Sequence, residues 1–384
     1  MAGKAREKRT GRMLAVGGSM GPGIIRFGQG YGYDGAIVEI NGDVLKRQCQ
    51  HFGVPGYTSL PAALAAHDDY VGAYIATPNQ FHAEMAIQLA RLGIPVFMEK
   101  PLGINEQECK AVMAAYRKSK GWLQIDFEYR FSPMYATAAE ILHSGEVGDL
   151  RSVNMEYTVG PYLPSYGWRL DPTASGGHFA EKLCHLLDLF RLWSRSEFRQ
   201  IRITAQPCAE AWYDPRSTDS LTADCVMESG VAVHLLHTQC STALPQDDRN
   251  QDTDWADYGH RLAAMLNCTE GTLQIDIWKR SLTVVKRDPE DNMKPRILRR
   301  IDFKHMPFMA LHHDMSGMLK DFVRRVHEGA GPRLPLEDSY RTMLAVFEAD
   351  RQLEKSSLEA NARFGKHKAG AGTRAAAGNR SKRA

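Results

Sequence analysis

The sequence predicts an α/β protein in which a domain with a parallel sheet is followed by an α+β domain with an open, mainly antiparallel sheet. Three observations support this fold class. Residues 73–103 have the pattern strand, helix, strand and charged turn, and a unit this short joins parallel strands through a crossover helix. Residues 13–23 run from an apolar strand into a glycine-rich turn. From residue 151 onwards, strands with alternating apolar and polar residues follow one another with short turns, which indicates antiparallel pairing.

The length and composition set the domain organisation. A chain of 384 residues with 43% hydrophobic residues is expected to form two domains with sizeable cores. We place the first domain at 12–125 and the second at 126–355. The ends, 1–11 and 356–384, are basic and have little with which to pack, so both are predicted to be disordered. A solvated tail explains this composition better than a nucleic-acid contact does.

The termini and the cysteines predict the compartment. No apolar run reaches the length of a membrane span, and the N-terminal MAGKAREKRTGR lacks the apolar core of a signal peptide. Seven cysteines, an odd number without a C-x-x-C pair, suit free thiols in a reducing environment. We therefore expect a cytoplasmic protein that does not bind a membrane.

The first strand, 13–16, ends in a turn that can bind phosphate groups. Glycines between a strand and a helix let backbone N–H groups approach a pyrophosphate at the helix N-terminus. The usual spacing, with glycines two and five positions after Gly17, is not kept, because Ser19 and Pro22 stand there. A shortened loop is the nearest fit. Its candidate cofactor-binding residues are Gly17, Gly18, Ser19, Met20 and Gly21.

The second strand, 35–40, places an acid where such folds bind the adenosine ribose. Glu39 would accept hydrogen bonds from both ribose hydroxyls of NAD and repel the 2′-phosphate of NADP. Asn41 at that place would instead favour NADP. Both residues remain candidates for cofactor binding, with NAD the preferred cofactor. Asp43 then caps the next predicted helix.

A buried strand at 73–76 leads into a polar turn and a helix that Asn79 can cap. This turn and the start of the helix lie beside the ligand-binding edge of a parallel sheet. The candidate cofactor-binding residues there are Thr77, Pro78, Asn79 and His82.

Lys100 stands at the carboxyl end of the next buried strand, 96–98. Open α/β sheets bind ligands at this edge, so Glu99 and Lys100 are further candidates for cofactor binding. A lysine held there by the following Pro101 is also a candidate catalytic group. On position alone, a surface lysine in a salt bridge is an equally good interpretation.

The remaining elements are assigned from periodicity and capping patterns. Helices are expected at 60–66, at 106–119 behind an Asn105 cap, and at 133–144. The expected strands of the second domain are 153–158, 200–206, 221–228, 231–239, 272–277, 281–286 and 297–303, followed by helices at 307–328 and 337–353. A polar insertion over 243–262 is a candidate cover for the site, with Trp255, Asp257, Tyr258 and His260.

The second informative stretch begins at Gly176 and Gly177, which permit close approach of a ligand to the backbone. If the following residues are helical, one polar stripe forms on an otherwise apolar helix. Its members, at spacings of three, four and three, are His178, Glu181, His185 and Asp188. A satisfied core histidine is the alternative for an isolated His. One straight helix rarely presents four ligands to one ion, so no metal site is expected.

Several motifs in order resemble the glucose-fructose oxidoreductase / inositol dehydrogenase (Gfo/Idh/MocA) family. The resemblance covers roughly residues 12–350. The motifs are TPNQFH (77–82), EKPLG (99–103), DFEYRFSPMY (126–135), GEVGDL (145–150) and WRLDPTASGGHFAEKLCHLLDLF (168–190). The resemblance implies a Rossmann NAD(P)-binding domain at 12–125, a substrate and oligomerisation domain at 126–355, and a homodimer or homotetramer.

The resemblance also implies roles for individual residues. It makes Lys100, His185 and Glu181 the catalytic group, with Glu181 standing where the family usually has Asp. The implied substrate-binding residues are Arg130, Trp168, Arg169, Glu181 and His185. The family usually has Asn or Gln where this chain has Glu128, which is a departure close to Arg130.

Together these features predict an NAD(P)-dependent oxidoreductase that transfers a hydride between the nicotinamide and a hydroxyl or ketone carbon of a sugar, inositol or related polyol. In the predicted mechanism, Lys100 orients the reacting hydroxyl, and His185, polarised by Glu181, removes its proton. One alternative is a redox-neutral enzyme that oxidises a sugar only transiently. Another is a non-catalytic NAD(P)-binding sensor or structural protein, which the irregular glycine turn favours.

Overall fold

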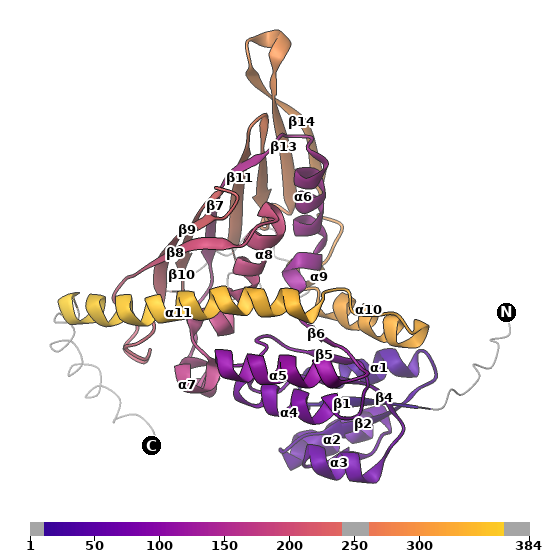
Figure 1. The fold of residues 1–384 in the computed structure, drawn as a ribbon. Helices are drawn as coiled ribbons and strands as arrows, with labels where there is room; N and C mark the ends of the chain where they lie inside the picture. Colours follow the sequence, from indigo (N-terminus) through magenta and orange to yellow (C-terminus); the bar gives the residue numbers. More distant parts are fainter. Residues whose placement is uncertain (1–10, 240–260, 365–384) are drawn as a thin grey trace, which may run out of the picture.

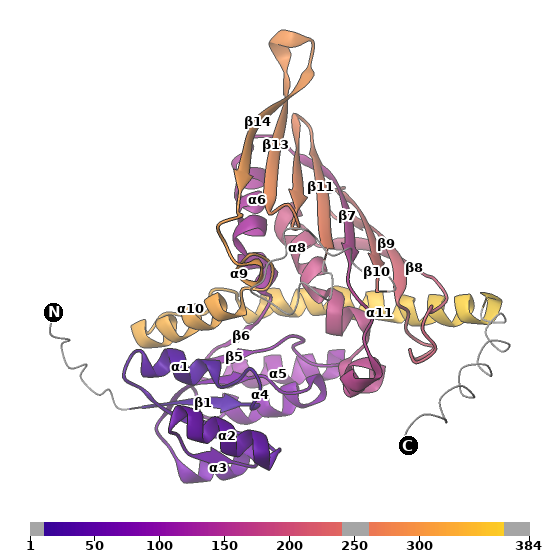
Figure 2. The same ribbon diagram turned by 180° about the vertical axis from the view of Figure 1, so that it is seen from behind.

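The computed structural model describes residues 11–239 and 261–364. Predictions for the two basic ends beyond these limits, and for the part of the insertion up to residue 260, lie outside the described residues. Two domains lie one above the other, and the long helix α11 (Leu336–Phe364) runs between them in both views (Figures 1 and 2).

The first domain contains a six-stranded parallel sheet in the order β3-β2-β1-β4-β5-β6. Its strands are β1 (Arg12–Val16), β2 (Asp34–Val38), β3 (Gly56–Tyr57), β4 (Tyr70–Ile75), β5 (Val96–Met98) and β6 (Leu123–Ile125). This order is that of the doubly wound Rossmann fold, which confirms the predicted fold of the first domain. The order reverses between β1 and β4, so a crevice for a ligand is expected at the carboxyl ends of those two strands.

Side-chain caps determine where several helices of this domain begin. The helices are α1 (Gly23–Gln29), α2 (Gly42–Phe52), α3 (Leu60–Ala66), α4 (His82–Ala90) and α5 (Glu106–Lys118). Asn105 and Glu108 cap α5 as predicted, because the side-chain Oδ1 of Asn105 accepts from the Glu108 N–H at 2.9 Å. The cap of α2 is Asn41 rather than Asp43, since Asn41 accepts from the N–H groups of Asp43 and Val44. Each such cap contributes about 1 kcal/mol.

One face of the first sheet is covered by a helix from near the end of the chain. In α10 (Met315–Glu328), Met318 and Phe322 pack with Met13, Tyr74 and Phe97 of the sheet in one buried cluster. A hydrophobic face of this size needs such a cover. Residues beyond the proposed boundary at 125 therefore complete the first domain.

The second domain is built on an eight-stranded sheet in the order β14-β13-β12-β11-β7-β10-β9-β8. Only β7 and β10 pair in parallel, so the sheet is mainly antiparallel, as predicted. Its strands are β7 (Leu150–Thr158), β8 (Phe198–Ala205), β9 (Ser220–Met227), β10 (Ala232–Thr238), β11 (Arg261–Cys268), β12 (Gly271–Asp276), β13 (Ser281–Asp288) and β14 (Lys294–Asp302). The sequence analysis missed β11, although Leu262, Ala264 and Leu266 alternate as in its neighbours.

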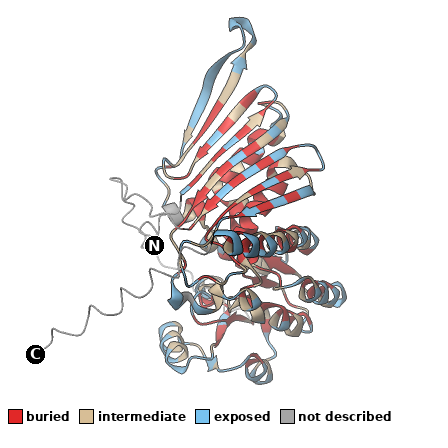
Figure 3. Ribbon diagram, turned by 90° about the vertical axis from the view of Figure 1, so that its left-hand side faces the viewer, coloured by how far each residue is buried: buried red, intermediate tan, exposed pale blue. Residues whose placement is uncertain are grey.

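Within residues 11–239 and 261–364, helices cover one face of this sheet and leave the other open. The covering helices include α6 (Pro133–Ser144), α8 (Cys184–Ser194) and α11. Buried and exposed residues alternate along the strands, as the red and pale-blue bands of Figure 3 show. On the open face, Leu236 and Met265 remain 39% and 42% exposed.

The helix α11 is longer than its prediction at 337–353. It continues to Phe364, where Ser357 and Ala360 are buried and the Ser356 hydroxyl accepts from the Ala205 N–H at 2.8 Å. The disordered tail predicted from 356 was therefore placed too early. The sequence pattern could not show this, because the helix is held by contacts with β8 from the other end of the domain.

Candidate active site

The polar segment after Gly176 is not one regular helix. A short helix α7 (Pro172–Ser175) is followed by a π-helical turn, Phe179–Leu183, and only then by α8. The carboxylate of Asp350 accepts from the N–H groups of Phe179 and Ala180 at 2.8 and 3.0 Å. Gly177 makes room for this contact, since its φ is +115° and a Cβ there would lie 2.4 Å from the Asp350 Cγ.

The π turn separates the residues of the predicted stripe. Its wider spacing rotates the side chains that follow relative to a regular α-helix. As a result, Glu181 faces the first domain, while His178 packs against His237 of β10 with ring centroids 5.2 Å apart. His185 stacks on Tyr129, and Asp188 accepts a hydrogen bond from Arg130. The single polar stripe predicted from the sequence is therefore divided among different partners in the structure.

Glu181 is the point where the two domains meet. The Lys100 ammonium donates to the Glu181 backbone carbonyl at 2.5 Å and lies 3.4 Å from its carboxylate. The Asn79 amide donates to the same carboxylate at 2.9 Å, and the Arg169 guanidinium lies 3.4 Å from its other oxygen. Arg169 also lies over the Trp168 ring at 5.4 Å. Five of the predicted site residues are thus brought together.

The charge on Lys100 follows from these contacts. Burial lowers the pKa of Lys100, but Glu181, Cys184 and Glu99 outweigh it and hold that pKa above its ordinary value. The side chain is therefore a permanent ammonium at neutral pH. It can donate a hydrogen bond and stabilise negative charge on an oxygen, but it cannot act as a base.

His185 lies next to Glu128 rather than Glu181. Its Nε2 is 4.0 Å from the Glu128 carboxylate, and its ring stacks on Tyr129 at 4.6 Å. Burial, and then the positive charges of Lys100 and nearby histidines, lower the pKa of His185 well below its ordinary value. The ring is therefore neutral and can accept a proton. The predicted polarisation of His185 by Glu181 is not what the structure shows, because the π turn directs Glu181 elsewhere.

Three buried carboxyl groups, those of Glu99, Asp126 and Glu128, lie near Lys100. Of these, only Glu99 was predicted to be a site residue. Burial raises the pKa of Glu99 to about 7 and that of Glu128 to about 8, and it raises the pKa of Asp126 well above its usual range. The Tyr74 hydroxyl donates to Glu99 at 2.6 Å. Close carboxyl groups cannot all ionise, so this cluster holds protons at neutral pH. The only sign of this carboxyl cluster in the sequence was Glu128, which stands where the family usually has an amide.

Two predicted site residues have structural partners instead. Arg130, a candidate for substrate binding, donates to both oxygens of the buried Asp188 at 2.6 and 2.8 Å and lies 2.9 Å from Asp338. Its guanidinium therefore joins helices, and a contact of Arg130 with the substrate stays a prediction. The nitrogens of His82 lie 2.8 and 2.9 Å from the carbonyl oxygens of Thr77 and Pro101. His82 thus ties the polar turn after β4 to the turn that carries Lys100.

The glycine turn after β1 fits a dinucleotide. Gly17 has a φ of +103°, and a Cβ there would lie 2.2 Å from the Ala76 carbonyl oxygen, so only glycine is accommodated. The Glu39 carboxylate accepts from the Gly18 N–H at 2.7 Å and from the Asn41 N–H at 2.7 Å. The Asn41 side chain caps α2, so the carboxylate beside the loop is that of Glu39. Ser19, Met20 and Gly21 complete this turn at the crevice between β1 and β4.

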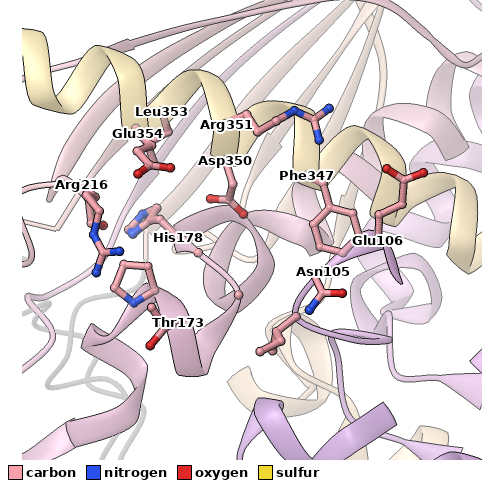
Figure 4. Close-up of a pocket in the computed structure, with 15 residues that line it drawn as sticks. Asn105, Glu106, Thr173, His178, Arg216, Phe347, Asp350, Arg351, Leu353 and Glu354 are labelled. Atoms are coloured by element: carbon pink, nitrogen blue, oxygen red, sulfur yellow. The ribbon is translucent and has the colours of Figure 1, made fainter. Parts of the chain in front are cut away.

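A cavity of about 300 Å³ lies behind the π turn, and Figure 4 shows His178 and Asp350 in its wall. Lys100 and His185 do not line it. A smaller cavity reaches Arg169 and Glu181, and the two share Pro172, Gly177, His178 and Ser217 as lining residues. His178 therefore lies between the rear cavity and the Glu181 side of the site.

Within residues 11–239 and 261–364, no group of His, Cys, Asp or Glu is arranged to hold a metal ion. Over the same residues, no helix is both long enough and apolar enough to cross a membrane.

Comparison with protein families decides the identity of both domains. Residues 35–127 match a model described as "Oxidoreductase family, NAD-binding Rossmann fold", and residues 135–274 match the GFO/IDH/MocA C-terminal domain. The chain belongs to the Gfo/Idh/MocA family. Its first domain is accordingly an NAD-binding Rossmann domain.

Members of the Gfo/Idh/MocA family with known names are distant relatives of this chain. Levoglucosan dehydrogenase of Pseudarthrobacter phenanthrenivorans is 29% identical over 40% of the chain and 41% of its own length. The scyllo-inositol 2-dehydrogenase (NAD(+)) of Bacillus subtilis is 26% identical over 63% of the chain and 66% of its own length. The match to these curated relatives thus spans about two fifths to two thirds of their length. A solved levoglucosan dehydrogenase in complex with NADH and levoglucosan has the same fold, with a TM-score of 0.71 at 18% identity over 92% of this chain and 98% of that one.

Proposed function

We propose that the protein is an NAD(P)-dependent oxidoreductase that transfers a hydride between the nicotinamide and a hydroxyl or ketone carbon of a sugar, inositol or related polyol. One observation carries the proposal: the Lys100 ammonium binds Glu181 at the carboxyl end of β5, on the ligand-binding edge of the Rossmann sheet. The names of the distant relatives, which act on levoglucosan and scyllo-inositol, support this substrate class.

The residues of the site suit the two proton-dependent parts of this reaction. The bound nicotinamide supplies the hydride acceptor or donor. Lys100 donates a hydrogen bond to the reacting oxygen and stabilises the negative charge that develops on it. His185, neutral and buried, takes the hydroxyl proton. Asn79, Glu181 and Arg169 supply donors and acceptors for the remaining hydroxyl groups.

NAD is the cofactor that the adenosine end of the site favours. The Glu39 carboxylate at the end of β2 is placed to accept hydrogen bonds from the ribose hydroxyls and to repel a 2′-phosphate. The Asn41 amide oxygen is already used by the N-terminus of α2. Separate titrations of NAD and NADP, followed by tryptophan fluorescence, test this: NAD is expected to bind at least about tenfold more tightly, as for one repelled charge.

The open face of the second sheet suggests how the subunits assemble. A sheet face with exposed apolar residues such as Leu236 and Met265 is suited to pairing with another copy. We expect a homodimer or homotetramer in the cytoplasm. Light scattering of the purified protein gives the number of subunits, and a monomer at all concentrations would contradict this assembly.

The first experiment on function is a substrate panel. Purified protein with NAD is offered sugars, sugar acids and inositols, and NADH formation is followed by absorbance. Steady NADH formation with one substrate class supports the dehydrogenase. Tightly bound NAD without net NADH, but with conversion of the sugar, would instead indicate the redox-neutral enzyme. No binding of either cofactor would indicate the non-catalytic protein.

A further inference from the structure

His185 is held by one short segment of chain, Phe127–Tyr129, which follows β6. The imidazole stacks on the Tyr129 ring at 4.6 Å with an interplanar angle of 17°, and the Phe127 ring meets it edge-on at 6.1 Å. Between these two aromatic residues, the Glu128 carboxylate lies 4.0 Å from the His185 Nε2. Three consecutive residues therefore fix the position and the orientation of the ring.

The two nitrogens of His185 have different surroundings. Nε2 faces the Glu128 carboxylate, whereas Nδ1 is buried and has no hydrogen-bond partner within residues 11–239 and 261–364. When Glu128 is ionised, its carboxylate beside Nε2 favours the tautomer with the proton on that nitrogen. Nδ1 then carries the free lone pair. Because buried polar atoms normally have partners, this one is left for a ligand hydroxyl.

Glu128 has a second partner that leads away from the site. His313, after the short helix α9 (Phe308–His312), hydrogen-bonds through Nδ1 to the Glu128 carboxylate. The Nε2 of His313 lies 3.2 Å from the Tyr129 hydroxyl. The side chain of His313 is 14% exposed and that of Glu128 is 4% exposed. The chain of contacts from His185 therefore runs through Glu128 towards the solvent.

We propose that Glu128 is the positioning residue of His185 and the outlet for the substrate proton. This inference rests on the proposed dehydrogenase function. During oxidation, the hydroxyl proton moves to Nδ1 of His185 and the Nε2 proton moves to Glu128. The hydride leaves the carbinol carbon with both bonding electrons for the nicotinamide, so that C–H and O–H bonds break and a C=O bond forms. Glu128 returns its proton to solvent through His313.

The charges around Glu128 predict a pH dependence. The acids Glu99, Asp126 and Asp314 face it, and Lys100 opposes their effect, as does Lys182 while it is charged; burial lowers the pKa of Lys182 to about 7. Burial is the largest influence and raises the pKa of Glu128 to about 8. Glu128 can accept a proton only when it is ionised. Oxidation is therefore expected to rise through pH 8, whereas the reverse reaction, which needs the protonated form, is expected to fall.

The activity test compares Glu128→Gln with the wild type across this pH range. We expect kcat for oxidation to fall at least about tenfold, as for loss of one proton-transfer partner, with KM nearly unchanged. The rise through pH 8 disappears in Glu128→Gln. The control is Asp126→Asn, which removes a carboxyl group of the same cluster that does not contact His185, and which keeps the rise. A rise retained in Glu128→Gln would overturn the proposal.

A second test needs no substrate, so it separates this inference from the proposed function. In protein labelled with ¹⁵N-histidine and studied above pH 8, where Glu128 is ionised, the wild-type His185 is expected to show the tautomer protonated at Nε2. Glu128→Gln loses this preference and Glu181→Gln keeps it. The opposite result, a tautomer that depends on Glu181 alone, would overturn the proposal even if the protein proved to be a dehydrogenase.

A third variant covers the case in which Glu128→Gln does not fold. His313→Ala removes the partially exposed end of the outlet and leaves a space that free imidazole can fill. Turnover is expected to fall about tenfold and to recover when imidazole is added, as for a replaced proton-transfer group. Unchanged turnover in His313→Ala, or a loss that imidazole does not restore, counts against the outlet.

Discussion

The two halves of the segment from His178 to Ser194 are equally buried but differ in how their polar groups are satisfied. In the second half, Asp188 accepts two hydrogen bonds from Arg130 and one from the Thr342 hydroxyl. Arg191 beside it donates to Glu197, Asp338 and Thr342. In the first half, the Nε2 of His178 and the Nδ1 of His185 have no partner among the described residues.

This difference separates a structural role from a functional one. A buried polar atom without a hydrogen bond costs about 1–3 kcal/mol, so native proteins rarely keep one without a use. The satisfied half, around Asp188, ties α8 to α11 and to the turn that follows β6. The first half, which holds the unpartnered nitrogens of His178 and His185, faces the Lys100 side of the molecule. These nitrogens can still bind a ligand. Changes in the two halves should therefore affect different measurements.

The largest effect on stability is expected from the satisfied half. Asp188→Ala removes the buried carboxylate that the half-buried Arg130 and the buried Arg191 share, which should lower the free energy of unfolding by about 3 kcal/mol or more. Urea unfolding measures this loss. Glu106→Ala, which breaks the exposed pair with Lys110, is the control and should leave the free energy of unfolding nearly unchanged. Equal losses in the two variants would show that Asp188 does not hold the fold.

The unsatisfied half should show its largest effect in turnover. Lys100→Ala and His185→Ala are each expected to lower kcat by about two orders of magnitude or more, as for loss of positioned acid–base groups. Binding of the cofactor at Glu39 should persist, because neither residue contacts the glycine turn. Steady-state kinetics and cofactor titration on the same samples test this. Near-normal turnover in either variant would refute its assigned role.

The buried acids near His185, and Glu128 in particular, should make the free energy of unfolding depend on pH. The folded-state pKa of Glu128, about 8, lies above its ordinary 4.5, so the folded form binds a proton that the unfolded chain has lost at neutral pH. Stability from this group is complete below about pH 4.5 and is lost as pH rises through 8. Between pH 6.5 and 8 the loss is about 2 kcal/mol.

The contribution of Glu128 is isolated by the difference in free energy of unfolding between the wild type and Glu128→Gln. Urea unfolding of the wild type and of Glu128→Gln is followed at several pH values from 6.5 to 9. As pH rises, the variant should become more stable relative to the wild type, because only the wild type has to ionise Glu128. Glu99 and the other acids titrate in both proteins and cancel. A constant gap would mean that the Glu128 carboxyl group ionises in the folded protein as easily as in the unfolded chain.

The sequence was sufficient for features that are set locally. The strands β1, β2, β4 and β5 of the Rossmann sheet, the Asn105 cap and the Lys100 position after β5 all follow from short patterns of apolar and capping residues. The alternation that defines β7 and its neighbours is equally local. These elements were predicted because each depends on residues within one strand or one helical turn.

The features that were missed depend on contacts between distant residues. The π turn at Phe179 is held by Asp350, which lies 171 positions away. The partner of His185 is Glu128, and the partner of Glu128 is His313, a further 185 positions along the chain. Helical periodicity carries no information about such contacts. The adjacent His312 and His313 in a predicted apolar helix were the one available signal, because polar residues there need buried partners.

The smallest expected effect concerns His178, which tests whether an unsatisfied nitrogen marks function. His178→Leu removes the unpartnered Nε2 at similar volume, so the free energy of unfolding should rise by up to about 1 kcal/mol. Because His178 lines the cavity that reaches Glu181, KM for the substrate should rise by about three- to tenfold while kcat stays close to that of the wild type. His234→Leu, on the exposed face of β10, is the control and should change neither quantity. A more stable variant with unchanged KM would show that a buried atom without a hydrogen bond in this segment need not bind a ligand. The functional role of the first half of the segment would then rest on His185 alone.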